Sequence, residues 1–196
     1  LEDNDGNVTD ITKLPVYRRA QMGVGYLAQE ASVFRHMSVE DNIMSVMEMS
    51  KLFSKEERKQ RLEDLLDEFN LHKVRKSKGI QLSGGERRRC EIARALAIDP
   101  KFILLDEPFA GVDPIAVKDI QLLIKRLHKK NIGILISVHN VNLAIRFADK
   151  IMLLPKNQHL IFGEPSQIIT TENLKKTFKT QIQLFNHPIY NCTQIC

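Results

Sequence analysis

The sequence reads Leu82-Ser83-Gly84-Gly85-Glu86 and, further along, Phe102-Ile103-Leu104-Leu105-Asp106-Glu107. The first run places a hydroxyl and two glycine amides at the predicted start of a helix, where backbone N–H groups and the helix dipole favour a phosphate. The second run is apolar and ends in two adjacent carboxylates, which suit a magnesium ion and an attacking water. Each run alone is weak evidence, because a serine cap with a Gly-Gly turn or two solvated acids would look the same.

The pattern around these runs predicts alternating strands and helices. Residues 101–106 form a continuous apolar run, which is typical of a strand buried on both faces of a sheet. Further strands are expected at 23–27, 134–136, 151–154 and 159–162, and helices at 38–50, 54–69, 83–97, 114–130, 140–147 and 164–178. Residues 1–20 and 179–196 are polar segments. This alternation predicts an α/β fold with a mostly parallel sheet.

Four segments follow from this pattern. Residues 1–37 are expected to be part of a core, and residues 38–99 to be a helical subdomain that ends in the helix after Ser83. Residues 100–163 return to the core, and residues 164–196 form a C-terminal helix and tail. Two serines mark helix starts in the insert, because Ser38 precedes Asp41 by three residues and Ser54 precedes Glu57 by three.

Composition excludes several classes of protein. The chain has 196 residues and a net charge of +5, with its basic residues scattered among acidic ones, so a mixed surface is favoured over a nucleic-acid partner. No apolar run approaches the ~20 residues of a membrane-spanning helix. The acidic N-terminus does not resemble a signal peptide. Cys90, Cys192 and Cys196 fit a reducing compartment, although the last two could form a disulfide or a poor metal site.

The two runs together resemble the nucleotide-binding subunits of ABC transporters, because Glu86-Arg87-Arg88-Arg89 and Ala93-Arg94-Ala95-Leu96 match the signature helix of that family. The resemblance implies a P-loop NTPase fold with ATP and Mg²⁺ as cofactors. Ser83, Gly84, Gly85 and Glu86 would then contact the nucleotide.

The resemblance assigns further roles to single residues. Asp106 would reach the magnesium shell, and Glu107 would orient the attacking water. Gln29 would head the Q-loop and contact the metal or its water. Asp113 would belong to the D-loop, although it precedes Pro114 and can also cap a helix. His139 would be the switch histidine that senses the γ-phosphate.

One expected motif is missing from the printed sequence. The sequence contains no G-x-x-x-x-G-K-[ST] run, which is the loop that cradles the phosphates in such sites. Because that loop precedes the Gln29 region in the family, we expect the chain to be a C-terminal portion of the subunit. We expect the chain as given to bind ATP poorly and not to hydrolyse it.

Residues 14–135 are similar to one branch of the family, the ATPases of bacterial lipopolysaccharide exporters, on the stretches 25–32, 82–89 and 102–114. The resemblance implies a homodimer at the cytoplasmic face of the inner membrane. Its permease partners would dock near Glu30, Phe34 and Arg35, unless Phe34 packs inward. From about residue 137 the sequence looks more like iron-chelate importer subunits. An importer subunit and a non-transport or inactive ABC fragment therefore stay open.

Overall fold

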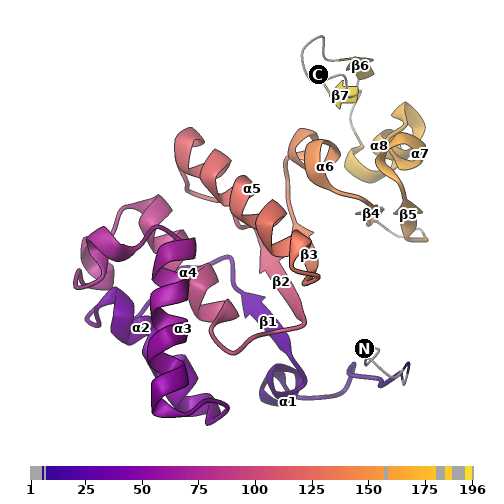
Figure 1. Cartoon of the computed structure of the whole chain (residues 1–196). Coiled ribbons are helices and arrows are strands. Elements are labelled where there is room, and N and C mark those ends of the chain that lie inside the picture. The colour runs from indigo at the N-terminus through magenta and orange to yellow at the C-terminus, as the bar shows by residue number, and fades with distance from the viewer. Residues whose placement is uncertain (1–5, 7, 157–158, 180–183, 187–192, 196) are drawn as a thin grey trace. The chain divides into compact units, whose positions relative to one another are not determined.

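The computed structural model describes residues 6, 8–156, 159–179, 184–186 and 193–195. The chain forms two compact units, Leu1–Ser137 and Val138–Cys196. Figure 1 shows the elements of both units in chain order. Cys192 and Cys196, the candidates for a disulfide or a metal site, lie outside the described residues. Cys90 is buried and free.

The first unit is built on a three-stranded sheet. Its strands are β1 (Val24–Leu27), β2 (Phe102–Asp106) and β3 (Gly133–Ser137). All neighbours are parallel and the order is β1-β2-β3. The strands are joined through helices, as parallel strands require. This arrangement confirms the predicted α/β fold with a parallel sheet.

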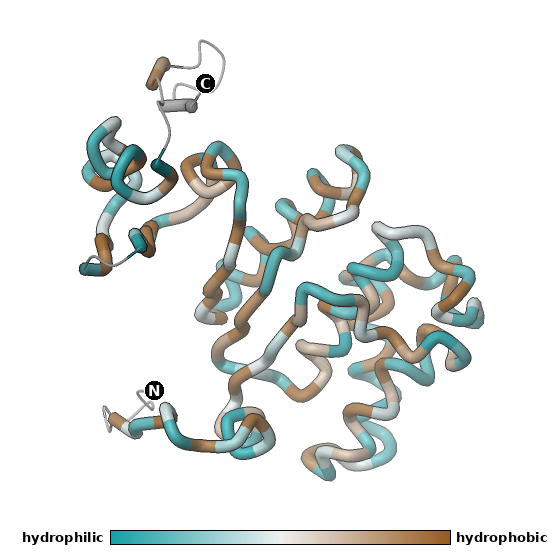
Figure 2. The backbone as a smooth tube through the Cα atoms, turned by 180° about the vertical axis from the view of Figure 1, so that it is seen from behind, coloured by the Kyte–Doolittle hydropathy of each residue, from teal (hydrophilic) through white to brown (hydrophobic). Residues whose placement is uncertain are grey.

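The two faces of this sheet differ in burial. Ile103 and Leu105 of β2 are fully buried on one face. On the other face the cross-strand row Tyr26, Leu104 and Leu135 includes side chains that are half-buried or exposed. The prediction that this strand is buried on both faces is therefore wrong in this chain. The apolar colouring along the strands in Figure 2 shows why the sequence suggested it.

Helices make up the rest of the first unit. They are α1 (Val16–Gln21), α2 (Val39–Ser50), α3 (Lys55–Glu68), α4 (Gly84–Leu96) and α5 (Pro114–Lys129), with short 3₁₀ turns η1 (His72–Val74) and η2 (Gly79–Gln81). Ser38 caps α2 through the Asp41 N–H, and Ser54 forms a capping box with Glu57 at α3, as expected. Helix α1 begins directly after Pro15, near the end of the polar segment 1–20, in which the sequence pattern predicted no helix.

Buried apolar side chains from α2, α3, α4 and α5 and from the buried face of the sheet form one continuous core. Two residues from the helical insert, Leu66 and Phe69, are almost completely buried in it. Burial of a side chain of this size stabilises a fold by roughly 1.5–3 kcal/mol. The insert and the sheet therefore share a core, and this core fixes α4 against β1 and β2.

The second unit contains short elements: α6 (Val141–Phe147), β4 (Ile151–Leu153), β5 (Ile161–Gly163), α7 (Pro165–Ile168), α8 (Thr171–Phe178), β6 (Leu184–Asn186) and β7 (Thr193–Ile195). The expected strand pair is confirmed, because β4 and β5 are antiparallel partners. Two expectations need correction. The helical stretch 164–178 is two helices, since Thr170 leaves the helical conformation and caps α8. The segment expected to be a polar tail contains the antiparallel pair β6 and β7.

Candidate functional site

The parallel register brings two predicted motifs to one edge of the sheet. Leu27 of β1 pairs with Leu105 of β2. Gln29 therefore follows one strand at the same edge where Asp106 and Glu107 end the other. The carboxyl ends of parallel strands are where ligands bind in open α/β sheets. This edge is thus the candidate site of the first unit.

Ser137, at the end of β3, organises the two acidic residues. Its hydroxyl donates a hydrogen bond to the Asp106 carboxylate and accepts one from the Glu107 backbone N–H at 3.0 Å. Asp106 and Ser137 are register partners across β2 and β3. Glu107 has a backbone φ of 44°, in the left-handed region that non-glycine residues rarely occupy. The backbone thus turns sharply at the residue expected to orient water.

Ser83 is the N-cap of α4, as predicted. Its hydroxyl accepts the Glu86 backbone N–H at 3.3 Å, and the Glu86 carboxylate accepts the Ser83 backbone N–H at 2.8 Å. These bonds from Ser83, with its backbone N–H contributing most, hold the pKa of Glu86 below its ordinary value. Ser83 and Gly84 are exposed, so the first turn of α4 is open to a ligand.

Gly84 and Gly85 also have a packing role. A Cβ on Gly84 would lie 3.1 Å from the Gly111 carbonyl oxygen, and one on Gly85 would lie 2.6 Å from the Ala116 methyl. The start of α4 therefore touches the loop before α5. Asp113 caps α5 by accepting the N–H groups of Ile115 and Ala116 at 3.0 Å, as its place before Pro114 suggested.

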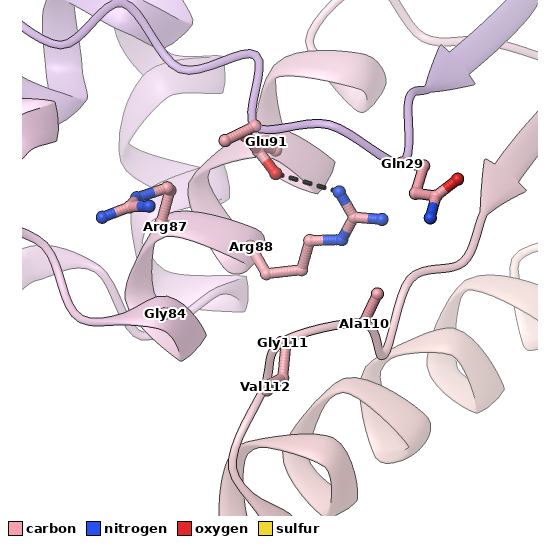
Figure 3. A pocket seen from close by; sticks show the side chains of 9 residues that line it. Gln29, Gly84, Arg87, Arg88, Glu91, Ala110, Gly111 and Val112 are labelled. Carbon is pink, nitrogen blue, oxygen red and sulfur yellow. Dashed lines mark hydrogen bonds and ion pairs between the residues drawn. The ribbon is translucent and has the colours of Figure 1, made fainter.

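A pocket of about 220 Å³ lies between these segments. Its lining residues come from the Gln29 segment, from α4 and from the loop before α5: Gln29, Ala31, Gly84, Arg87, Arg88, Glu91, Ala110, Gly111 and Val112. Figure 3 shows Arg88 pointing toward Glu91, while Arg87 points away from them. The fold therefore brings three predicted motifs around one hollow.

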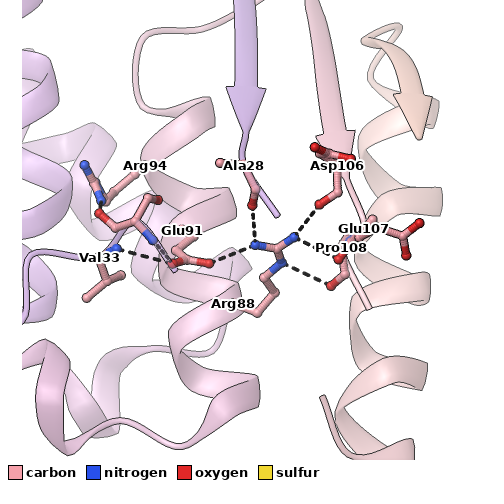
Figure 4. Close-up of polar contacts among 9 residues, drawn as sticks. Ala28, Val33, Arg88, Glu91, Arg94, Asp106, Glu107 and Pro108 are labelled. Carbon is pink, nitrogen blue, oxygen red and sulfur yellow. Dashed lines mark hydrogen bonds and ion pairs between the residues drawn. The ribbon is translucent and has the colours of Figure 1, made fainter. Parts of the chain in front are cut away.

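Sequence reasoning missed a buried ion pair among the residues that line this pocket. The side chains of Arg88 and Glu91 are 6% and 2% exposed, and Arg88 Nη1 lies 3.0 Å from a Glu91 carboxylate oxygen. Figure 4 shows the guanidinium reaching from α4 to the ends of β1 and β2. Opposite charges three residues apart on one helix were the available signal. Ser137 was missed as well, since a serine that ends a strand has no distinctive pattern.

The expected docking segment, residues 30–35, lies on the surface beside α4. Phe34 is 48% exposed, with the Arg94 guanidinium 4.6 Å from its ring centroid. Asn42, fully buried on α2, bonds both the N–H and the carbonyl of Phe34. Glu30 and Arg35 are exposed. The alternative of an inward-packed Phe34 is therefore wrong, whereas docking itself stays a prediction.

His139 belongs to the second unit. It is exposed and directly precedes Asn140, which caps α6 by accepting the Leu143 N–H at 3.3 Å. Among the described residues, no three His, Cys, Asp or Glu side chains cluster as a ready metal site. Mg²⁺ does not need one, because it typically takes one or two carboxylates and completes its shell with phosphates and water. The oxygens of Asp106 and Gln29 fit that chemistry.

Comparison with known families adds an independent finding. Residues 2–110 match the family described as "ABC transporter". An uncharacterized ABC transporter ATP-binding protein of Rhizobium meliloti is 49% identical over 172 residues, which cover 88% of this chain and 63% of that protein. The lipopolysaccharide export system ATP-binding protein LptB of Escherichia coli K12 is 47% identical over 86% of this chain and 70% of LptB. The chain thus spans less than two thirds of the first of these relatives.

Solved structures show the same similarity. A structure described as a metal-chelate type ABC transporter in an inward-facing conformation aligns with a TM-score of 0.77 and 30% identity, over 89% of this chain and 71% of that one. A dimeric ATP-binding cassette bound to ADP and phosphate aligns with a TM-score of 0.67 and 25% identity, over 84% of this chain and 72% of that one. No helix within the described part of the chain has the length and apolar character to cross a bilayer.

Proposed function

Because this chain belongs to the ABC transporter family, we propose that it is part of an ATP-binding and ATP-hydrolysing subunit that energises lipopolysaccharide export. One observation carries the proposal: the parallel register places Gln29 and the acidic pair Asp106-Glu107 at one edge of the sheet, and the neighbouring pocket is lined by Gln29 and by Gly84 at the N-terminus of α4. An ATP-dependent enzyme needs oxygen ligands for Mg²⁺, a carboxylate near the attacking water and N–H donors for phosphate. The sheet edge offers the oxygen ligands and the carboxylate, and the N-terminus of α4 offers the N–H donors.

Each residue has a separate role in this proposal. Asp106 and Gln29 hold Mg²⁺ together with the phosphates. Glu107 accepts a hydrogen bond from the attacking water and orients it toward the γ-phosphate. His139 donates a hydrogen bond to the γ-phosphate while it leaves. The positive end of α4, with Ser83, Gly84, Gly85 and Glu86, stabilises phosphate charge.

A second copy of the subunit belongs to the proposal. Ser83 and Gly84 are exposed at the first turn of α4, so they can face the phosphates bound by another copy. Asp113, at the start of α5, lies next to them and would contact the same interface. The subunit would therefore act as a homodimer, in which each nucleotide lies between two chains.

The substrate assignment rests on sequence similarity. LptB relatives are 46–50% identical to this chain, whereas the metal-chelate transporter structure is 30% identical. Lipopolysaccharide export from the cytoplasmic face of the inner membrane is therefore favoured, with permease subunits docking near Glu30, Phe34 and Arg35. An iron-chelate importer subunit is the second candidate, favoured by the TM-score of 0.77. A non-transport or inactive ABC fragment is the third.

The test uses the chain extended at its N-terminus by a segment with a Gly-Lys-Ser/Thr loop, which we call the extended protein. It should hydrolyse ATP in a Mg²⁺-dependent manner. The Glu107→Gln variant should bind ATP yet lose hydrolysis by at least about a hundredfold, because an amide keeps the shape but polarises water poorly. ATP should then hold it as a stable dimer in size-exclusion chromatography. Full activity of Glu107→Gln would overturn the assignment, and the permease that co-purifies would decide between exporter and importer.

A further inference from the structure

The Arg88 guanidinium holds the backbone on both sides of Glu107. Its Nη2 donates to the carbonyl oxygens of Asp106 and Glu107 at 2.8 and 3.0 Å, and its Nε donates to that of Pro108 at 3.1 Å. Glu107 keeps its left-handed backbone between these bonds. A non-glycine residue persists in that conformation where its surroundings fix it. Arg88 is therefore one of the groups that set the direction of the Glu107 side chain.

The pair also holds the backbone before and after Gln29. Nη1 of Arg88 donates to the Ala28 carbonyl at 2.9 Å. One Glu91 oxygen accepts from Arg88 at 3.0 Å, and the other accepts the backbone N–H groups of Ser32 and Val33 at 2.6 and 3.2 Å. Thus all five guanidinium N–H groups have acceptors inside the protein. The two buried side chains directly join the ends of β1 and β2.

The docking segment is also bonded to α2 and η2 of the helical subdomain. Asn42 holds both polar backbone atoms of Phe34, and the Ile80 N–H donates to the Arg35 carbonyl at 2.9 Å. A Cβ on Gly79 would lie 2.3 Å from a Val33 methyl, so η2 packs directly on this segment. The docking segment is therefore held from two sides: Asn42 and η2 hold Phe34 and Arg35, and Glu91 of α4 accepts the N–H groups of Ser32 and Val33.

We propose that Arg88 and Glu91 are positioning residues that couple the docking segment to the backbone of Glu107. The inference rests on the proposed function, in which a permease meets the surface around Phe34 and Glu107 orients the attacking water. Displacement of Ser32 and Val33 moves the Glu91 carboxylate, and Arg88 follows because its buried charge is paired with that carboxylate. The three carbonyls around Glu107 then lose their donors.

The experiment measures amide hydrogen exchange by NMR on the 196-residue chain, which needs no nucleotide. Glu91→Gln should accelerate exchange at Ser32 and Val33, and also at least about tenfold at the Glu107 N–H, which Glu91 does not contact. Arg88→Lys should accelerate exchange at the Glu107 N–H and also at the more distant N–H groups of Ser32 and Val33. Cys90→Ala is the matched control, because it removes a buried thiol from a residue that lies between the two on α4.

If exchange rates change only at the groups that each substituted residue contacts, the coupling is overturned. Equal changes in exchange rates in Cys90→Ala would overturn it as well. If Glu91→Gln does not fold, Glu91→Asp keeps the charge on a shorter side chain and should show the same pattern at smaller amplitude. In the extended protein, Glu91→Gln should lower kcat at least about tenfold with little change in the KM for ATP. An extended wild-type protein without ATPase activity would reject the proposed function, whereas the exchange data would still decide the coupling.

Discussion

Gly85 at the start of α4 lies directly against Ala116 in the first turn of α5, so close that a Cβ on Gly85 would stand 2.6 Å from the Ala116 methyl. The glycine is thus required by packing within one chain, apart from any phosphate that it could approach. The contact sets how closely the first turns of α4 and α5 can approach each other.

The Gly85→Ala substitution should destabilise the protein by about 1–2 kcal/mol, because overpacking a close contact outweighs the gain in helix propensity. Ala116→Gly alone should cost about 1 kcal/mol, as glycine does inside a helix. The double variant should be more stable than the sum of the two effects by about 1 kcal/mol. Urea unfolding of all four proteins measures this coupling, and strict additivity would contradict the contact.

Ser83 should act on the nucleotide bound by the other subunit. In mixed dimers of the extended protein, one subunit carries Ser83→Glu and its partner carries an intact signature segment. The added carboxylate should repel only the phosphates of the nucleotide that the partner binds, because the mutated α4 faces that nucleotide. Inactivating the nucleotide loop of either subunit in turn identifies that site. If activity is lost instead at the site whose nucleotide the mutated subunit itself binds, Ser83 does not act across the dimer.

His139→Ala in the extended protein should lower kcat by about 10²–10⁴-fold, with a much smaller loss of ATP affinity, because the imidazole contact matters most as the γ-phosphate leaves. His159→Ala is a matched control, since His159 is also exposed in the second unit. Steady-state turnover and nucleotide binding are measured side by side. Equal losses of turnover and affinity would make His139 a plain binding residue.

Phe34→Ala should abolish co-purification with the permease, while the free energy of unfolding changes by less than about 1 kcal/mol. The physical reason is that Phe34 is an exposed aromatic anchor on a segment fixed by Asn42 and Glu91. Tyr17→Ala is the control, because Tyr17 is also exposed and carries Arg18 over its ring at 5.6 Å. Retention of the permease by Phe34→Ala would reject this docking surface.

Cys90 should stay unreactive in the folded chain, because burial raises the pKa of its thiol to about 12. The unfolded chain ionises near the ordinary value of 9.0, so this group stabilises the fold fully below that pH, and its contribution declines as the pH rises above it. Thiol titration of a Cys192→Ser/Cys196→Ser variant checks the reactivity. Between about pH 7.5 and about pH 10, the free energy of unfolding measured in urea should fall more for this variant than for the same variant with Cys90→Ala added. Fast labelling of the folded protein would contradict this burial.

Local patterns in the sequence determined the elements that position the site. Hydrophobic periodicity predicted helices 38–50, 54–69 and 83–97, and serine caps predicted their starts, because both depend on residues only a few positions apart. The apolar run before Asp106 predicted a strand for the same reason. The sequence pattern did not predict the break between α7 and α8 at Thr170, nor the strand pair β6 and β7. These short elements depend on packing rather than on local pattern.

Only the tertiary structure decided which distant groups meet. Arg88 and Ser137 both bond the backbone of Glu107, because β2 and β3 are parallel neighbours and the Arg88 guanidinium reaches from α4 to the end of β2. The exposed row of Tyr26 and Leu135 likewise depends on what packs against each face of the sheet. The sequence by itself determined the family motifs and the helix starts, since these are local. Contacts between residues dozens of positions apart required the fold, because register and helix placement bring them together.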